Sequence, residues 1–89
     1  MQEVTVTVRH KVGLHARPAA LFVQTAKRFS SNVLCTKDGR QADAKSILGI
    51  LTLGANKGAI VTIRAEGEDE AEAIAALKQL IEDNFGEEE

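Results

Sequence analysis

Apolar and polar residues alternate in the first stretch of the chain. Every second position is a valine and the positions between are threonines, a period-two pattern typical of a strand with one buried face. The alternation is carried by Val4, Thr5, Val6, Thr7 and Val8. The segment 9–15 contains Gly13 and shows neither the strand nor the helix period, so we expect a loop there.

A helical period replaces the alternation from Ala16 to about Arg28. Apolar residues recur at i, i+3, i+4 and i+7 and form one stripe, namely Ala19, Phe22, Val23 and Ala26. Pro18 suits the first turn of this helix, where its missing backbone N–H is not needed. We therefore expect a helix whose apolar stripe faces a core.

A hairpin is predicted in the middle of the chain. The polar run Ser30–Asn32 ends the helix, and Val33–Lys37 has the composition of a strand. The pair Asp38-Gly39 follows, which favours a type I′ turn because both central positions of that turn need positive φ. Arg40–Asp43 is then expected to be a short return strand.

A second helix and a fourth strand are expected after the hairpin. Ser46 begins a short apolar segment that runs to Leu53 and is predicted to be helical, and 54–58 is predicted to be a loop. Ala59–Glu66 is predicted to be a strand with three apolar side chains on one face: Val61, Ile63 and Ala65.

The last helix has its own start and stop signals. Glu68 or Asp69 can cap it, and Glu72 stands three residues beyond Asp69, as in a capping box. Asn84–Gly86 is predicted to end the helix, and the acidic tail 87–89 is expected to be frayed. The expected buried stripe is Ile74, Leu77 and Ile81, with Leu80 beside it.

The predicted element order is β-α-β-β-α-β-α, a split-βαβ arrangement with one added helix. Because the strands alternate apolar and polar residues, the sheet is expected to be antiparallel with one covered face. All the helices should then lie on that face, which makes the fold class α+β. The length of 89 residues suits one domain, residues 1–89.

Composition and charge narrow the classes of protein that fit. The single cysteine, Cys35, cannot form an internal disulfide, and no apolar run approaches the roughly 20 residues of a membrane span. The chain starts with the strand pattern rather than a signal peptide, so we expect a cytoplasmic protein without a membrane segment.

Residues 9–45 carry eight basic and two acidic side chains, which can attract an anion or an acidic partner. For most of these charges a solvated surface is the simpler interpretation.

The candidate chemistry lies where the first loop meets the first helix. His15 stands directly before that helix, near its first backbone N–H groups. This end of a helix carries about half a positive elementary charge. This position disfavours the cationic imidazole, so His15 is expected to be neutral and nucleophilic near neutral pH. An anion attached to it would meet the backbone donors of Ala16 and Arg17. The guanidinium of Arg17 can also bind phosphate oxygens in a bidentate manner.

Other interpretations of His15 follow from the same residues. A histidine at a helix start is often only a cap or a surface residue, and the spacing alone favours that interpretation. A metal site is weaker, because His10 lies across a loop and the sequence has no other histidine and no second cysteine. A Ser–His–acid hydrolase is disfavoured because no Gly-x-Ser-x-Gly elbow occurs.

Two segments resemble one known family. Residues 13–19, Gly-Leu-His-Ala-Arg-Pro-Ala, are similar to the active-site signature of HPr, the histidine phosphocarrier of the bacterial sugar phosphotransferase system. Residues 45–54, Lys-Ser-Ile-Leu-Gly-Ile-Leu-Thr-Leu-Gly, resemble the regulatory serine region of the same family. The resemblance covers essentially the whole chain, and the two motifs stand at the family's usual separation.

The resemblance implies a fold and a reaction. The family fold is an open-faced β-sandwich, a four-stranded antiparallel sheet in the order 1-4-2-3 under three helices, and this order does not follow from the periodicity. HPr-like proteins receive a phosphoryl group from phosphoenolpyruvate by way of enzyme I and pass it to the A domains of sugar-specific enzymes II. The phosphate is carried on the imidazole Nδ1 of the histidine that matches His15, and the arginine role matches Arg17. Such a chain is a carrier rather than an enzyme, with no cofactor and no metal.

The second helix is apolar nearly all round, although a short helix on a sheet can bury only one side. We expect Ile47, Leu48 and Leu51 to be exposed, and an exposed apolar cluster suggests a docking surface. The pattern alone leaves open whether these residues are core under the last helix, and the family resemblance favours docking.

The first helix is expected to contribute to the same surface. Ala20, Gln24 and Lys27 continue the face that begins at Ala16 and Arg17. An apolar centre with a basic rim has the anatomy of an interface for acidic, transient partners.

Ser46 stands where the second helix needs an N-cap, a role worth about 1 kcal/mol. The resemblance also implies regulatory phosphorylation of this serine, which calls for an HPr kinase/phosphorylase and a catabolite-control transcription regulator that reads the phosphoserine form. A phosphate at a helix start leaves the fold intact and places negative charge beside the docking cluster.

Three other functions are compatible with parts of the sequence. An RNA-binding module of similar topology is disfavoured, because the chain has no Tyr or Trp and its three phenylalanines fall on predicted helices or their ends. A purely regulatory paralogue without the histidine is disfavoured because His15 is present. A carrier of the nitrogen-related branch keeps the same histidine and stays open. We expect a monomer that binds neither nucleic acid nor membrane.

Overall fold

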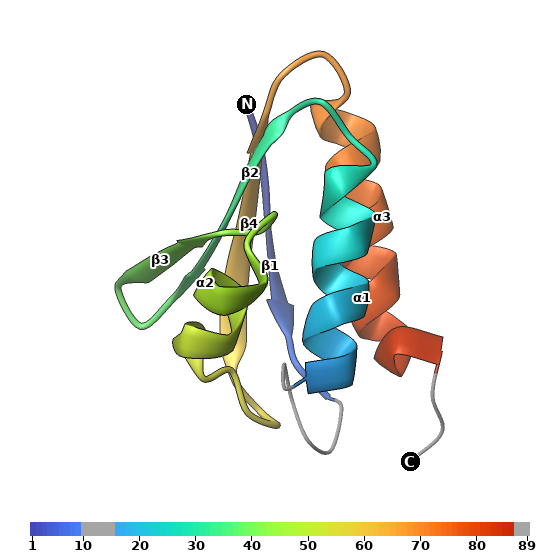
Figure 1. The fold of residues 1–89 in the computed structure, drawn as a ribbon. Coiled ribbons are helices and arrows are strands. Elements are labelled where there is room, and N and C mark those ends of the chain that lie inside the picture. The colour runs from blue at the N-terminus through green and yellow to red at the C-terminus, as the bar shows by residue number, and fades with distance from the viewer. Residues whose placement is uncertain (10–15, 87–89) are drawn as a thin grey trace.

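The computed structural model describes residues 1–9 and 16–86 of the chain (Figure 1). Its elements follow the predicted order, with a short 3₁₀ turn added at the end. They are β1 (Gln2–Thr7), α1 (Ala16–Lys27), β2 (Asn32–Lys37), β3 (Arg40–Asp43), α2 (Ile47–Leu53), β4 (Ile60–Glu66), α3 (Glu70–Glu82) and η1 (Asn84–Gly86). The predictions for residues 10–15 of the first loop and for the tail 87–89 lie outside the described residues.

The four strands form one antiparallel sheet in the order β1-β4-β2-β3. Strand β4 lies between β1 and β2, and its register pairs Val61 with Val6 on one side and Ile63 with Cys35 on the other. This is the order that the family resemblance implied. The α+β open-faced sandwich is therefore confirmed.

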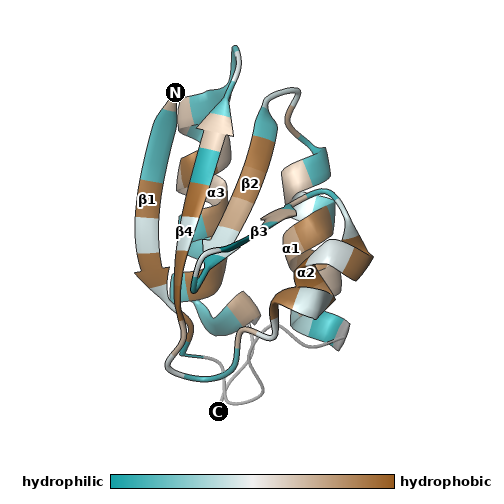
Figure 2. Cartoon of the chain, turned by 90° about the vertical axis from the view of Figure 1, so that its left-hand side faces the viewer, coloured by the Kyte–Doolittle hydropathy of each residue, from teal (hydrophilic) through white to brown (hydrophobic). Residues whose placement is uncertain are grey.

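All three helices cover one face of the sheet and leave the other face open (Figures 1 and 2). Helices α1 and α3 lie side by side, and α2 packs against α1 and β3. The strands alternate as predicted, since Ile63 and Ala65 are buried under the helices while Arg64 between them is exposed. Outer-face residues instead pair with each other across strands, as the guanidinium of Arg64 does with the carboxylate of Glu3 at 2.9 Å.

The core is made from the apolar stripes predicted on the two long helices. Buried residues on α1 and α3 include Ala19, Phe22, Val23, Ala26, Ile74, Leu77 and Ile81, and Leu80 is half-buried beside them. Burial of each large side chain stabilises the fold by about 1.5–3 kcal/mol. This packing also fixes the rotation of α1 about its axis, so that Arg17, Gln24 and Lys27 face solvent.

The hairpin between β2 and β3 has the predicted turn. Asp38 and Gly39 both have positive φ, 50° and 80°, and Lys37 pairs with Arg40 across the turn. These two left-handed residues are the condition for a type I′ turn, whose twist matches that of the flanking strands.

The predicted N-cap position of α3 is confirmed at Asp69, whereas the predicted capping box is wrong. Asp69 occupies the N-cap position, but its side chain makes no capping hydrogen bond, so the capping box with Glu72 does not form. The carboxylate of Asp69 instead accepts hydrogen bonds from the Ser31 hydroxyl and from the backbone N–H groups of Ser30 and Ser31, the latter two at 2.9 Å. The bond from the Ser31 hydroxyl, followed by that from the Ser30 N–H, lowers the pKa of Asp69 to about 2. Asp69 therefore joins the turn after α1 to the start of α3.

The predicted stop of the last helix is confirmed. Helix α3 ends at Glu82, and the following η1 has left-handed residues at Asn84 (φ 52°) and Phe85 (φ 59°). Phe85 turns back onto the core and is buried there.

Candidate functional site

Helix α1 begins at Ala16, the residue directly after His15. His15 itself lies outside the described residues, so its predicted neutral, nucleophilic state stays a prediction. The first backbone N–H groups of any helix lack intrahelical acceptors, and no acidic side chain stands in the first turn of α1. The start of α1 can therefore hold an anion on backbone donors.

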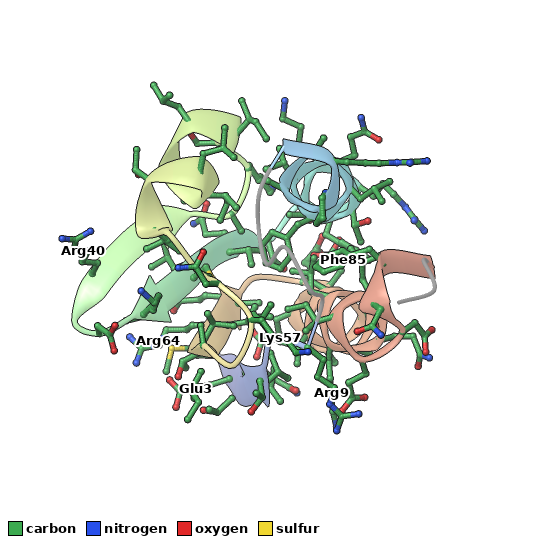
Figure 3. The ribbon with its side chains drawn as sticks, turned by 90° about the horizontal axis from the view of Figure 1, so that it is seen from below. Glu3, Arg9, Arg40, Lys57, Arg64 and Phe85 are labelled. Carbon is green, nitrogen blue, oxygen red and sulfur yellow. The ribbon has the colours of Figure 1, made fainter. Side chains whose placement is uncertain are left out.

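The start of α1 carries a cation of the sign that an anion needs. Arg17 is exposed in the first turn of α1, and Pro18 beside it is buried, which anchors that turn. Figure 3 views the molecule from this end and shows Arg9 and Lys57 on it, from the segments that follow β1 and precede β4. Both side chains belong to exposed residues. In that view the Arg9 side chain points away from α1, and the exposed Asp83 follows α3 at the same end of the molecule, so the cation that favours a phosphate at the start of α1 is Arg17.

Ser46 is the N-cap of α2, as predicted. Its backbone is extended (φ −112°, ψ 114°), and its Oγ accepts a hydrogen bond from the N–H of Gly49 at 3.1 Å. The helix ends at Leu53, and its C-cap Gly54 adopts φ 65° and donates its N–H to the carbonyl of Leu51 at 3.3 Å. Both ends of this short helix are thus defined by local hydrogen bonds.

The apolar side chains of α2 divide between core and solvent. Ile50 and Leu53 are buried, whereas Ile47, Leu48 and Leu51 are 43%, 71% and 39% exposed. The expectation that these three residues are exposed is confirmed, and the alternative that the whole helix is core is wrong. The structure leaves the cluster open to solvent, and its use as a docking surface stays a prediction.

Helix α1 lies beside this cluster and offers the residues that the sequence singled out. Gln24 and Lys27 are exposed and Ala20 is half-buried. Helices α1 and α2 pack against each other, so the two sets lie on neighbouring elements. We call this surface, made of Ala20, Gln24, Lys27, Ile47, Leu48 and Leu51, the α1–α2 face.

One residue that holds the α1–α2 face together was not recognised from the sequence. The ammonium of Lys45 donates a hydrogen bond to the backbone carbonyl of Phe29 at 2.7 Å, and so joins the segment before α2 to the segment after α1. No local pattern indicates this bond, because the two residues are distant in sequence and each is ordinary in its own segment.

The described residues offer neither a reactive thiol nor a metal site. Burial raises the pKa of the Cys35 thiol to about 12, so this cysteine is not a nucleophile at neutral pH. Among residues 1–9 and 16–86, no three His, Cys, Asp or Glu side chains are arranged to hold a metal ion. Within the same residues no helix has the length and apolarity to cross a membrane.

Comparison with known proteins points to one family. The family model described as "PTS HPr component phosphorylation site" matches residues 2–83. The phosphocarrier protein HPr of Xylella fastidiosa (strain Temecula1 / ATCC 700964) is 45% identical over 87 residues, which cover 98% of each chain. The HPr-like protein Crh of Bacillus subtilis (strain 168) is 49% identical over 83 residues, which cover 93% of this chain and 98% of that one.

Solved structures agree with these relatives. A crystal structure of HPr-C-His from Thermoanaerobacter tengcongensis is 57% identical, covers 100% of both chains and has a TM-score of 0.98. An HPr dimer from the same organism, also 57% identical, covers 98% of this chain and 100% of that one with a TM-score of 0.79. Because that relative is a dimer, the expectation of a monomer stays a prediction.

Proposed function

This chain belongs to the HPr family of phosphotransferase-system phosphocarriers, and on that premise we propose that it carries a phosphoryl group on His15. The group comes from phospho-enzyme I and goes to the A domains of sugar-specific enzymes II, in the cytoplasm. The chain is a carrier and not an enzyme, because its own histidine is the group that is modified and restored.

Each transfer is a single exchange of bonds at phosphorus. The neutral imidazole Nδ1 of His15 supplies the electron pair for a new N–P bond while the bond between phosphorus and the donor breaks and leaves its electrons on the donor. The reverse exchange delivers the phosphoryl group to the A domain and restores the imidazole. The stored phosphate is stabilised by the backbone N–H groups of Ala16 and Arg17 and by the Arg17 guanidinium.

One observation carries this proposal: α1 begins at the residue after His15 and bears an exposed arginine, with no acid, in its first turn. A phosphate attached to the preceding residue therefore enters a region of positive potential without any rearrangement of α1. The same feature favours the neutral imidazole before transfer, because a positive helix end disfavours a second positive charge.

The test is phosphorylation of the purified chain with phosphoenolpyruvate and its cognate enzyme I, followed by phosphorus NMR. We expect one acid-labile phosphohistidine signal from the wild type and none from His15→Ala. Arg17→Ala should be phosphorylated more slowly while keeping its unfolding temperature. No signal from the wild type, or normal labelling of His15→Ala, would contradict the proposal.

We further propose that donors and acceptors dock in turn on the α1–α2 face. Two features support this use: the exposed apolar centre from α2, and two exposed basic residues on α1, Arg17 in its first turn and Lys27 in its last. A shared surface means that enzyme I and an A domain compete for the carrier, and each complex is short-lived.

Ser46 is proposed as a regulatory phosphorylation site, which places this chain in catabolite control as well as in transport. The likeness to Crh, the B. subtilis catabolite protein, and the position of Ser46 next to Ile47 and Leu48 support this role. A phosphate there adds about −1.5 to −2 charge at a helix start, so the helix survives while an acidic partner is repelled.

The regulatory proposal is tested with an HPr kinase/phosphorylase and mass spectrometry. We expect one phosphate on the wild type and none on Ser46→Ala, and the phosphorylated chain should have a raised KM in the enzyme I reaction. Absence of phosphate on Ser46 would refute the kinase step alone and leave transfer through His15 unaffected. Binding of the phosphoserine form to a catabolite-control transcription regulator is the next measurement.

A further inference from the structure

The turn after α1 is held from both sides by the segments that begin the other two helices. The backbone N–H of Ser30 donates to the carboxylate of Asp69, the N-cap residue of α3, at 2.9 Å. The carbonyl of Phe29 accepts a hydrogen bond from the ammonium of Lys45, one residue before the N-cap of α2, at 2.7 Å. These two backbone groups belong to the same peptide unit, the one that joins Phe29 to Ser30. A single peptide unit therefore connects the end of α1 to the starts of α2 and α3.

The two side chains that hold this peptide unit carry opposite charges. Hydrogen bonds, first that from the Ser31 hydroxyl, lower the pKa of Asp69 to about 2, so its carboxylate is ionised at neutral pH. A peptide unit that donates to an anion and accepts from a cation is polarised in one direction by both, so the two hydrogen bonds strengthen each other. We call the arrangement of Lys45, the peptide unit 29–30 and Asp69 the three-helix link.

The ammonium of Lys45 binds this carbonyl although two carboxylates are near it. Lys45 lines a cavity of about 340 Å³ together with Asp43 and Glu66. Within residues 1–9 and 16–86 it forms an ion pair with neither of them. Because a carboxylate is ordinarily the stronger acceptor for an ammonium, the preference for the carbonyl agrees with a peptide unit that Asp69 already polarises.

Helix α2 is short enough to depend on this link. It has seven residues, too few for a stable isolated helix in water, and its buried side chains are Ile50 and Leu53. Two hydrogen bonds connect Lys45 to the start of the helix: its N–H donates to Asp43 Oδ1 at 2.9 Å, and the N–H of Ser46 donates to the Asp43 carbonyl at 3.0 Å. The bond from Lys45 to the turn after α1 therefore sets where α2 begins relative to α1.

We propose that Lys45 is a positioning residue for docking, and that through the three-helix link it keeps the exposed side chains of α2 in place beside α1. The inference rests on the proposed docking of partners on the α1–α2 face. Without the link, α2 stays on the core through its two buried side chains but shifts relative to α1. A partner that contacts both helices then meets the right arrangement only part of the time, and its affinity falls by that fraction. The chemistry at His15 is unchanged.

The link itself is tested without any partner, by urea unfolding of Lys45→Met, Asp69→Asn and the double variant. Methionine keeps the apolar stem of the lysine and removes its ammonium. We expect the two sites to be coupled by at least about twofold in the unfolding equilibrium constant, as for groups in one hydrogen-bond network. Lys78→Met removes the same charge from an exposed residue of α3 and should show no such coupling with Asp69→Asn. Independent effects of Lys45→Met and Asp69→Asn overturn the link.

The positioning role is tested by steady-state phosphorylation by enzyme I, with the carrier as the varied substrate, well below the unfolding temperature of each variant. If the right arrangement is populated between half and a tenth of the time, Lys45→Met raises KM about two- to tenfold and leaves kcat unchanged. Lys45→Arg keeps a charged donor and should stay near the wild type. Asp69→Asn should also raise KM, although Asp69 is not part of the α1–α2 face.

The salt dependence of KM separates positioning from a direct contact between Lys45 and an acidic partner. Removing a cation that contacts the partner weakens this dependence, as Lys27→Met should, whereas Lys45→Met should leave it unchanged. An unchanged KM for Lys45→Met, or a weakened salt dependence, overturns the positioning role. Leu48→Asp in the same assay then shows which proposal has failed: a raised KM keeps the docking surface and rejects only the role of Lys45, and an unchanged KM rejects the docking surface as well.

Discussion

Replacing Leu48 by aspartate tests the α1–α2 face most directly, because Leu48 is the most exposed apolar side chain of α2, at 71%. A docked partner can remove no more than that exposed fraction from water. Full burial of a leucine is worth about 1.5–3 kcal/mol, so this contact contributes about 1–2 kcal/mol, or about 5- to 30-fold in affinity. The aspartate also needs desolvation in the complex, which makes the loss at least this large.

The assay is steady-state phosphorylation by enzyme I with the carrier as the varied substrate. We expect the KM for Leu48→Asp to rise by that factor while the unfolding temperature stays near the wild-type value, because the side chain leaves no cavity. Ile60→Asp is the matched control, since Ile60 is 62% exposed on the open face of the sheet. Its KM should stay within about twofold of the wild type. Equal KM values for the two variants would refute the docking surface.

The remaining predictions concern stability and reactivity. Gly67→Ala should lower the free energy of unfolding by at least about 2 kcal/mol in urea titrations, because Gly67 has φ 151° and a Cβ there would lie 2.6 Å from Ser31 Oγ and 2.7 Å from Ser31 Cα; an unchanged midpoint would contradict this. The free energy of unfolding should also fall as the pH drops from about 5 towards 2. The pKa of Asp69 is about 2 in the folded state, below its ordinary value of 3.8, so the ionised carboxylate stabilises the folded protein above the unfolded-state pKa. This stabilisation is lost as the pH falls through the folded-state pKa. Asp69→Asn should remove this part of the pH dependence of the urea midpoint. The pKa of Cys35 is raised to about 12, so its thiol should not react with a disulfide reagent at pH 8 until the protein unfolds. The free energy of unfolding should also fall as the pH rises above about 9, because only the thiol of the unfolded chain ionises there. Rapid labelling of the folded chain would show that the thiol is accessible.

Much of the fold could be predicted because local periodicity reports which side of each element is buried. The stripe of α1, the alternation of β4 and the Asp38-Gly39 turn are all properties of neighbouring residues, and all are confirmed. The position of β4 between β1 and β2 could not be derived in this way. Strand order depends on which apolar faces fit together in three dimensions, and here it came from the family resemblance.

The error at Asp69 has a similar cause. Its position before α3 is correct for a cap, but the turn after α1 offers it several donors, two backbone N–H groups and a hydroxyl. The Asp69 carboxylate can accept hydrogen bonds either from its own helix or from the turn after α1. Tertiary packing decides between these donors, and the local sequence around Asp69 does not contain that information. The predicted capping bond of Ser46, by contrast, forms.

At the candidate site, sequence reasoning predicted the exposed cluster on α2 because a seven-residue helix with apolar residues all round cannot bury them all. It did not predict the bond from Lys45 to Phe29, because these two residues meet only in the folded chain. The position of His15 before α1 was evident from the sequence, since Pro18 marks the first turn.

The pairing of β1 with β4 has a consequence for how the chain reaches its fold. The hairpin of β2 and β3 joins neighbouring segments and can close early, whereas β1 pairs with Ile60–Glu66, which follows α1, β2, β3 and α2 in the chain. Loop closure over most of the sequence is entropically costly, so this pairing is expected late in folding. During synthesis β1 is made before its partner strand and stays unpaired until Ile60–Glu66 has left the ribosome. The edge that completes the sheet is thus the segment most exposed to mispairing while the protein is being made.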